Sequence, residues 1–210
     1  MINDRSPCVA CTCAAKVSFL LLPRIAAAYS GTCRQIRMPK NDPLSRVPSL
    51  YHFTDRRNLE LIRGLGGLFP LAELEERGIE IPAPGSDEGS RIVDRQRDLH
   101  RYVHLCFKSN HPMEYLARQQ GRIGDSIFLQ VHSSVIHWEG VLFVPGMANT
   151  NGITFHTVDE ARHMIDYEVL YTRTNWSDPQ VQERLQAAEK YEILVPRVIP
   201  LDLIRNLPNG

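Results

Sequence analysis

The order of short apolar runs limits the fold of this chain more than any other feature of its sequence. From residue 48 onward, runs rich in β-branched and aromatic side chains are interleaved irregularly with segments of helical character. Strands are predicted at 49–54, 102–107, 126–132, 141–144 and 191–195, and helices at 55–64, 70–76, 112–119, 157–165 and 178–190. Because a parallel α/β sheet needs a helix after each strand, this pattern predicts an α+β fold with a mixed sheet split around a cleft.

Two loops stand out between these elements. Residues 82–97 are rich in Pro, Gly and charged side chains, and residues 146–152 read Gly-Met-Ala-Asn-Thr-Asn-Gly. A long loop without secondary structure of its own is often functional. We therefore expect the segment 82–97 to contribute to a binding site.

The first 40 residues differ from the rest of the chain. No helical or strand period runs through them, so residues 1–40 are predicted to be a disordered extension before a folded domain at 41–210. Met38 opens a polar lead into the first strand, and residues 1–37 are interpreted as a disordered extension or the product of an upstream start. Cys8 and Cys11 have the spacing of zinc ligands, but a structural site needs four ligands and we expect no metal. The cysteines are not spread over the fold as a disulfide framework would be, which predicts a reducing, cytoplasmic setting.

The balance of charge excludes a general electrostatic attraction to nucleic acid. The chain has 24 Lys and Arg residues and 24 Asp and Glu residues, so binding would need a local patch. Between Arg91 and Arg122, basic residues are interleaved with Tyr102, Phe107 and Tyr115, as single-strand binding requires, although an ordinary solvated face has a similar composition. No stretch approaches the roughly 20 apolar residues of a membrane-spanning helix, and no membrane partner is expected.

Several common enzyme signatures are missing from the sequence. It has no P-loop, no His-Glu-x-x-His and no Gly-x-Ser-x-Gly. The run Gly64-Leu65-Gly66-Gly67 ends a predicted helix, whereas a dinucleotide-binding glycine motif would open one. A Rossmann-type site is therefore not expected.

Three segments in the same order resemble those of one known family. The first segment is Tyr51-His52-Phe53-Thr54, followed by Asn58-Leu59. The second is Leu99-His100-Arg101-Tyr102-Val103, followed by Pro112-Met113 and Tyr115. The third is 188–195, which reads Ala-Glu-Lys-Tyr-Glu-Ile-Leu-Val. These segments are similar to the Tyr-His-x-Thr strand, the Leu-His-Asp-Tyr-Val and Ser-Pro-Met-x-Tyr segments and the glutamate strand of DarT-type DNA ADP-ribosyltransferases. Each match alone is weak, but together they span roughly residues 48–205.

The resemblance implies a fold, an activity and a set of residues. It implies an ADP-ribosyltransferase fold, with peripheral helices around an NAD cleft, that uses NAD without a metal to modify thymine or guanine in single-stranded DNA. Such proteins are toxins whose partner is an antitoxin with a macrodomain. A chain with this reaction is a glycosyltransferase of the pentosyltransferase class. The broader term nucleotidyltransferase is also expected to apply to it. The resemblance implies a catalytic Glu192 and an NAD pocket that includes His52, Thr54 and Asn58.

The sequence also departs from the family pattern. Members that modify thymidine have an arginine before Ser-Pro-Met, where this chain has Ser109-Asn110-His111. Their Asp-Arg-His-Gly loop is replaced by Asn149-Thr150-Asn151-Gly152, without the histidine. These differences favour guanine slightly over thymine as the target base.

The chemistry of the candidate residues suits breakage of the bond between nicotinamide and ribose. A carboxylate stabilises the positive charge that develops at the anomeric carbon, and strand alternation places Glu192 on one face with Leu194. By residue type alone, an exposed edge-strand glutamate is the commoner outcome, and Glu189 at a helix end is the rival acid. His52 and Thr54 alternate onto one face and suit ribose hydroxyls and the carboxamide, the alternative being a core histidine beside a helix-capping threonine.

The pyrophosphate of NAD calls for an arginine, and the segment 82–97 offers a choice of three. Arg91 is the first choice for this binding role and for a share in catalysis, ahead of Arg95 and Arg97. The alternative is a solvated loop of mixed sign. Two other functions stay open: an ADP-ribosyltransferase acting on RNA or protein, and a non-catalytic nucleic-acid-binding module on a degenerate transferase fold.

Overall fold

The computed structural model describes residues 42–208 of the 210-residue chain. The predicted extension at 1–40, its boundary at residue 41 and the cysteines Cys8, Cys11, Cys13 and Cys33 lie outside the described residues. Within 42–208, the α+β class and the split sheet are confirmed, and every strand pair is antiparallel, so the sheet is not mixed.

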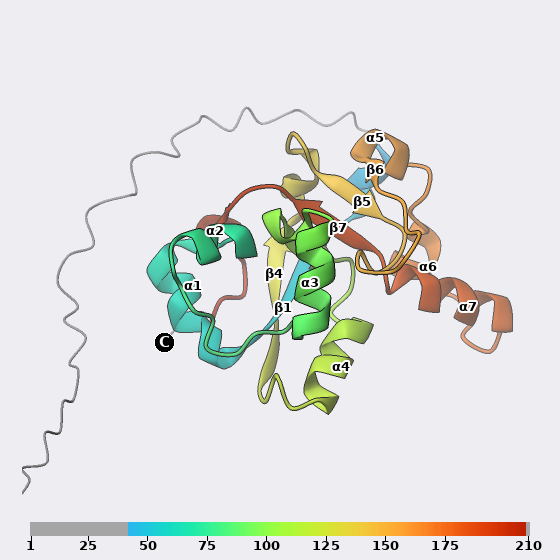
Figure 1. Ribbon diagram of the computed structural model, residues 1–210. Helices are drawn as coiled ribbons and strands as arrows, with labels where there is room; N and C mark the ends of the chain where they lie inside the picture. The colour runs from blue at the N-terminus through green and yellow to red at the C-terminus, as the bar shows by residue number, and fades with distance from the viewer. Residues whose placement is uncertain (1–41, 209–210) are drawn as a thin grey trace, which may run out of the picture. The chain divides into compact units, whose positions relative to one another are not determined.

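Six strands form the main sheet, in the order β4-β1-β3-β7-β5-β6 (Figure 1). Their bounds are β1 Ser49–Asp55, β3 Val103–Cys106, β4 Ser126–His132, β5 Leu142–Val144, β6 His156–Thr157 and β7 Glu192–Val195. A second sheet pairs β2 (Gly67–Leu68) with β8 (Ile199–Pro200). Since β7 lies between β3 and β5, it is a central strand and not an edge strand.

Strand alternation separates the core from the functional face of β3 and β7. Leu105 pairs with Ile193 and both belong to the main hydrophobic core. Residues directly opposite each other in an antiparallel pair share a face, so Cys106 and its partner Glu192 lie on the other side. Each fully buried Leu or Ile of this core contributes roughly 1.5–3 kcal/mol relative to an exposed side chain.

The sheet is split between β1 and β3. These neighbours share one register pair, Tyr51 with Cys106, whereas β1 pairs with β4 along its whole length from Ser49 to Asp55. Backbone groups of β3 beyond that point have no partner on β1 and are open to side chains. The split therefore provides a place for polar groups between two well-packed halves of the sheet.

Seven α-helices complete the described part of the chain. They are α1 Leu59–Leu65, α2 Leu71–Glu76, α3 Glu88–Gln96, α4 Pro112–Gln119, α5 Val158–Ala161, α6 Tyr167–Tyr171 and α7 Pro179–Ala188. Short 3-10 turns lie at Pro43–Arg46, Arg56–Asn58, Leu99–Arg101, Ser133–His137 and Leu201–Leu203. In Figure 1, α3 crosses in front of β1.

Local signals explain most helix limits. Asp55 caps the turn at 56–58 with its carboxylate, and Gly66 at φ 83° ends α1 in the left-handed conformation that glycine adopts without strain. The expectation that 82–97 forms a loop was wrong for its second half, because Asp87 caps the helix α3 there. That helix has no buried residue, so it lacks the apolar stripe by which helices are predicted.

Candidate active site

A cavity of about 250 Å³ opens at the split between β1 and β3. Its polar wall includes side chains from β1, α3, β3, the start of α4 and β7, among them His52, Thr54, Asp94, His104, His111 and Glu192. Its apolar wall comes from α1, α2 and the segments beside them, through Leu61, Ile62, Leu65, Leu68, Phe69, Leu71, Leu74 and Ile81. A mostly apolar cavity with a few converging polar groups is the usual form of a small-molecule site.

Glu192 is the carboxylate at the centre of this polar wall. It is 6% exposed and begins β7, between Cys106 of β3 and Val144 of β5. Its Oε2 lies 3.0 Å from Nδ1 of His104, and its Oε1 accepts the backbone N–H of Ala148 at 3.4 Å. The rival acid, Glu189, follows α7 and accepts a hydrogen bond from Asn110 at an exposed position. The geometry therefore favours Glu192 over the exposed-edge alternative.

His52 spans the split in the sheet. Its Nδ1 lies 3.0 Å from the backbone carbonyl oxygen of His104, which accepts the proton that Nδ1 must carry. The hydrogen bond selects one tautomer and leaves a lone pair on Nε2. Burial lowers the pKa of His52 and outweighs the opposing effect of the hydrogen bond to the His104 carbonyl, so the ring is neutral at physiological pH. His52 can therefore donate to the protein and accept from a ligand.

Thr54 and Asn58 form a buried polar unit at the far end of β1. Asn58 Nδ2 donates to Thr54 Oγ1 at 3.0 Å and to the carbonyl of Ala83 at 2.7 Å. Asn58 Oδ1 accepts from the Ala83 N–H at 2.9 Å. All the direct bonds of the Asn58 amide thus go to the protein, and the residue holds Thr54 and the segment at 83 beside the cavity.

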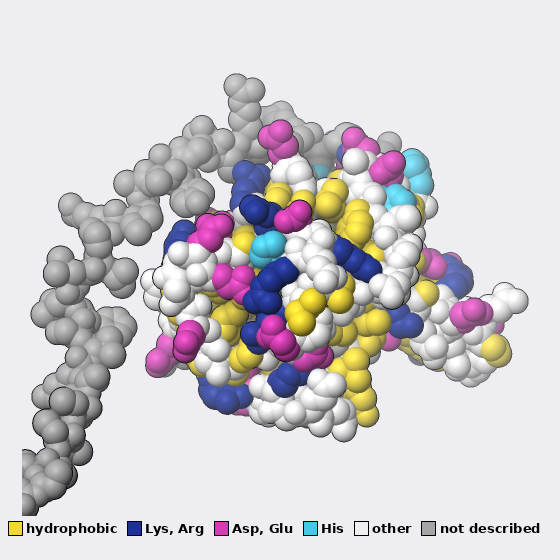
Figure 2. Space-filling model, viewed as in Figure 1, with side chains coloured by type: hydrophobic (Ala, Val, Ile, Leu, Met, Phe, Trp, Pro, Cys, Tyr) yellow, Lys and Arg dark blue, Asp and Glu magenta, His cyan; other side chains and the backbone are white. Residues whose placement is uncertain are grey.

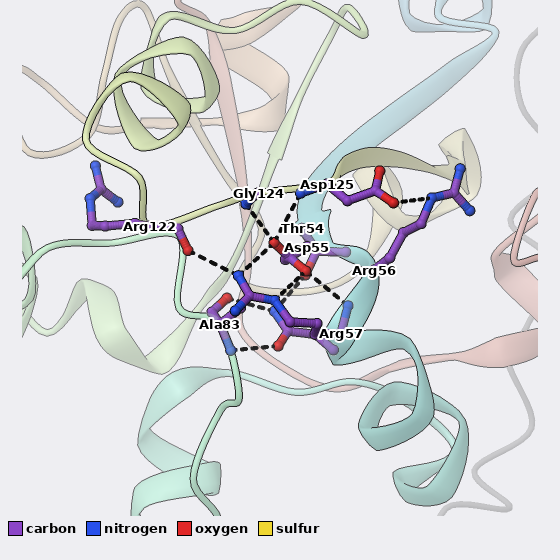
Figure 3. A network of polar contacts seen from close by, with 9 residues as sticks. Thr54, Asp55, Arg56, Arg57, Ala83, Arg122, Gly124 and Asp125 are labelled. Carbon is purple, nitrogen blue, oxygen red and sulfur yellow. Dashed lines mark hydrogen bonds and ion pairs between the residues drawn. The ribbon is translucent and has the colours of Figure 1, made fainter.

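The next residue, Asp55, fastens two loops to the same end of β1 (Figure 3). Its buried carboxylate accepts from Arg57 Nε and Nη2, both at 2.9 Å, and from the Arg57 N–H at 2.9 Å. It also accepts from the N–H groups of Gly124 at 2.8 Å and Asp125 at 3.3 Å. The side-chain hydrogen bond from Arg57 is the main cause that holds the pKa of Asp55 far below its usual value, against the effect of burial.

Helix α3 and the residue after it carry three arginines, none of which lines the cavity. Arg91 donates to Ser86, a cavity residue, through Nε at 3.2 Å and Nη2 at 3.3 Å. Arg95 forms ion pairs with Glu75 and Glu88 at the surface. Arg91 also pairs with Glu88 at 3.9 Å, but of the two arginines it is the one that contacts a residue of the cavity lining.

The third arginine, Arg97, ties α3 to the loop that covers Glu192. Its guanidinium donates to the carbonyls of Ala148 at 3.2 Å and Thr150 at 2.8 Å and to Asn151 Oδ1 at 2.8 Å. Asn149 of the same loop donates to Ser90 of α3 at 3.4 Å. Because the Ala148 N–H binds Glu192, Arg97 also acts on the placement of that carboxylate.

Three further polar residues of the site were missed by sequence reasoning. His104 and His111 flank Glu192, and the carboxylate of Asp94 lines the cavity from α3. Burial raises the pKa of Asp94, helped by the charge of Glu192 and opposed by His104. Alternation along 102–107 could have placed His104 and Cys106 on one face, but nothing local to the sequence places that face beside residue 192.

Two other classes of site find no support in the described part of the chain. Between residues 42 and 208, no group of three or more His, Cys, Asp or Glu side chains is arranged to hold a metal ion. In the same range, no helix has the length and apolar character needed to cross a bilayer.

Burial raises the pKa of the Cys106 thiol well above its usual value, so this thiol stays protonated and is a poor nucleophile.

The sequence model of one protein family matches residues 51–207. Its description is ssDNA thymidine ADP-ribosyltransferase, DarT. No curated protein sequence matches the chain.

Solved structures of DarT proteins share the fold of this chain. One is Thermus sp. 2.9 DarT in complex with ADP-ribosylated ssDNA, at 21% identity and a TM-score of 0.56, covering 75% of this chain and 79% of that one. The same protein in complex with NAD+ gives 22% identity, a TM-score of 0.51, and coverage of 76% and 80%. Thermosipho africanus DarTG in complex with ADP-ribose gives 20% identity and a TM-score of 0.57, covering 75% of this chain and 42% of that one.

Proposed function

Because the chain belongs to the DarT family of single-stranded DNA ADP-ribosyltransferases, which depend on NAD, we propose that its reaction takes place at the cavity around Glu192. The observation that carries this assignment is the position of Glu192. It is a buried carboxylate on a central strand, it lines the cavity, and three neighbouring polar groups face its two oxygens. A carboxylate held in this way can stabilise the charge that develops at a ribose carbon.

The cavity has polar groups that suit NAD. Among residues 42–208, Asp94 Oδ1, His100 Nδ1 and His111 Nε2 are buried without a hydrogen-bond partner, and all three residues line the cavity. Buried polar atoms are usually paired, so unpaired ones around a cavity are expected to meet a ligand. NAD would supply ribose hydroxyls and a carboxamide as partners, together with nicotinamide as the leaving group.

Four residues form the proposed NAD pocket with Glu192. His52 presents a lone pair at Nε2 toward ribose or carboxamide donors, and Thr54 presents its hydroxyl, which Asn58 keeps oriented. Arg91 would leave Ser86 for the pyrophosphate, where it would also balance negative charge during transfer. Bond breakage is at the N-glycosidic bond, so the phosphoanhydride stays intact and a nucleotidyltransferase activity has no support.

The acceptor is proposed to be a base in single-stranded DNA. A base in a duplex hides its Watson–Crick edge, and flipping it out costs a few kcal/mol. The face over α3 shows Lys and Arg side chains interspersed with Asp and Glu (Figure 2), so DNA contact there would rest on individual arginines and not on a broad basic surface.

The target base is thymine or guanine. The family description names thymidine, whereas Asn110 and Asn151 stand in segments where thymidine-modifying members carry an arginine and a histidine. We favour guanine slightly because of these two differences. In either case Glu192 or a neighbouring side chain would take the proton from the attacking nitrogen.

The biological role that we propose is that of a cytoplasmic toxin in a toxin–antitoxin pair. NAD and replicating DNA are both found in the cytoplasm. A macrodomain-type antitoxin would reverse the modification, and the similarity to a structure named DarTG suggests such a partner. Expression of the chain alone should then stop growth and induce a DNA-damage response, and Glu192→Ala should relieve both effects.

The test is a labelling experiment with NAD and four separate acceptors: single-stranded DNA, duplex DNA, RNA and protein. Mass spectrometry of homopolymeric oligonucleotides should show ADP-ribose on one base of single-stranded DNA. Glu192→Ala should abolish transfer while NAD affinity changes by less than about tenfold, because the carboxylate acts mainly in the transition state. Glu189→Ala, which removes an acid outside the cavity lining, is the matched control and should stay active.

Four outcomes would contradict parts of this proposal. Full activity of a folded Glu192→Ala protein would remove the catalytic assignment. Exclusive labelling of RNA or protein would replace the acceptor, and exclusive labelling of thymine would overturn the preference for guanine. NAD-independent DNA binding that is indifferent to Glu192, with no transfer to any acceptor, would show a non-catalytic binding module.

A further inference from the structure

We propose that His104 is a positioning residue that carries a proton on both ring nitrogens and thereby holds the Glu192 carboxylate in its place in the cavity. This inference rests on the proposed function, because it assigns a task to the partner of the proposed catalytic residue. It starts from the contacts of a histidine that no sequence motif singles out.

Both ring nitrogens of His104 face acceptors. Nδ1 lies 3.0 Å from Glu192 Oε2, and Nε2 lies 3.3 Å from the backbone carbonyl oxygen of Leu99. A carbonyl has no proton to offer, and a neutral imidazole has only one N–H. A neutral ring beside an ionised Glu192 would therefore place a nitrogen lone pair against an oxygen lone pair, whereas the imidazolium satisfies both partners.

Two further groups face the other oxygen of the Glu192 carboxylate. Its Oε1 accepts the Ala148 N–H at 3.4 Å and lies 3.8 Å from Nε2 of His111. Because His111 Nδ1 accepts the N–H of Met113, the proton of this ring is on Nε2. The distance of 3.8 Å is too long for a hydrogen bond, so the contacts that hold the carboxylate are those with His104 and Ala148.

The titratable groups around His104 come from four neighbouring elements. Glu192 on β7 and Asp94 on α3 favour its protonated form, whereas His52 on β1 and His111 before α4 are neutral neighbours whose own pKa values burial lowers. Burial would lower the pKa of His104 as well. The hydrogen bond and charge of Glu192, with the charge of Asp94, more than offset it, so the pKa lies above its usual value.

The contact between His104 and Glu192 should weaken as pH rises. A histidine whose pKa is raised on folding keeps its contacts below the ordinary value of about 6.5 and loses them as pH rises through the raised value. Above that pH, Glu192 loses its cationic neighbour and is free to turn away from the reacting geometry. Misplacement of a reacting group by about 1 Å can cost on the order of 100-fold in rate.

The first experiment observes the ring itself and needs no activity. Nitrogen-15 NMR of the histidine-labelled full chain, titrated without NAD, should show His104 protonated at both nitrogens at pH 6.5. His104→Asn identifies the resonance by its loss. Glu192→Gln should lower the pKa of His104 below that of the unsubstituted chain. A ring that is neutral at pH 6.5, or that is unaffected by Glu192→Gln, overturns the proposal whether or not the chain is active.

The second experiment measures kcat and KM for NAD across pH. His104→Leu should lower kcat by 10- to 100-fold and change KM by less than about threefold, since positioning acts on the transition state. His104→Asn keeps a donor near the Nδ1 position without a titrating proton, so it should recover most of kcat and lose the alkaline decline. His163→Asn, at an exposed site, is the matched control. An unchanged kcat and pH profile in His104→Leu, or a change in KM alone, refutes the positioning role.

Discussion

Replacement of Asp55 by Asn tests whether the end of β1 is held by one buried carboxylate. The Asp55 side chain is 0% exposed and accepts five hydrogen bonds, two from the Arg57 side chain and three from backbone N–H groups at 57, 124 and 125. An asparagine of the same shape keeps one acceptor oxygen. Its amide nitrogen would take the place of the other carboxylate oxygen, so the N–H groups that bind this oxygen would lose their acceptor.

The expected loss in unfolding free energy comes from the N–H groups that lose their acceptor. If the amide replaces Oδ2, the N–H groups of Gly124 and Asp125 lose a charged acceptor, and a hydrogen bond to a charged group contributes about 1.5–3 kcal/mol. The Arg57 side chain is 57% exposed, so water replaces most of what its contact contributes. We therefore expect a loss of about 3 kcal/mol in unfolding free energy, or a fall in Tm of about 6–12 °C for a folded unit of this size.

The effect should also depend on pH. The pKa of Asp55 is lowered in the folded state, mainly by Arg57, so its contribution to stability is present above the unfolded value of about 4. It is lost as pH falls through the lower folded value. The difference between the original chain and Asp55→Asn should be complete at pH 7 and should shrink below about pH 4.

Urea unfolding at pH 7, 5 and 3.5 measures these differences. The matched control is Asp125→Asn, which removes a carboxylate that is 67% exposed and paired with Arg56 at 3.1 Å. An exposed pair of this kind contributes about 0–1 kcal/mol. A loss below about 1 kcal/mol for Asp55→Asn, or a loss that does not vary with pH, would refute the reasoning about the buried carboxylate.

Three further predictions concern packing, chain length and the loop over Glu192. Gly67→Ala should lower the free energy of unfolding by about 1–3 kcal/mol, because the added Cβ would overlap the carbonyl oxygen of Ile199. Gly64→Ala in α1, where the added Cβ meets open space, should raise the free energy of unfolding by about 0.5–1 kcal/mol. Thermal unfolding of the two variants measures the difference. A chain that begins at Met38 should melt and react like the full chain, and a loss of folding, or one equivalent of zinc in the full chain, would contradict this. Arg97→Ala should lower kcat by about tenfold in steady-state kinetics, since three hydrogen bonds to the segment that places the Ala148 N–H against Glu192 are lost, and an unchanged kcat would count against that role.

The sequence by itself determined the elements whose signals are local. The strand at 126–132 and the helix at 112–119 have the predicted limits, because β-branched alternation marks the first and Pro112 opens the second. Alternation also placed Glu192 and Leu194 on one face of β7, opposite Ile193 in the main core. Family membership rested on short motifs that survive in order, and the same motifs predicted roles for Glu192 and His52, both of which line the cavity.

Elements without a local signal were decided by tertiary structure. Helix α3 buries no residue, so its sequence is that of a polar loop. The pairing of Gly67 with Pro200 joins distant segments that are too short to show a strand period. Such elements form because neighbours in space stabilise them, and a local pattern contains no information about those neighbours.

The arrangement of the site is likewise a tertiary result. His104 and Glu192 are 88 positions apart, and the antiparallel register that sets Cys106 opposite Glu192 brings them within a hydrogen bond. His111 reaches the same carboxylate from the turn before α4. Residue types could suggest that a carboxylate and an imidazole take part, but only the paired strands decide which imidazole meets Glu192, because a shift of register by one residue would turn every side chain to the opposite face.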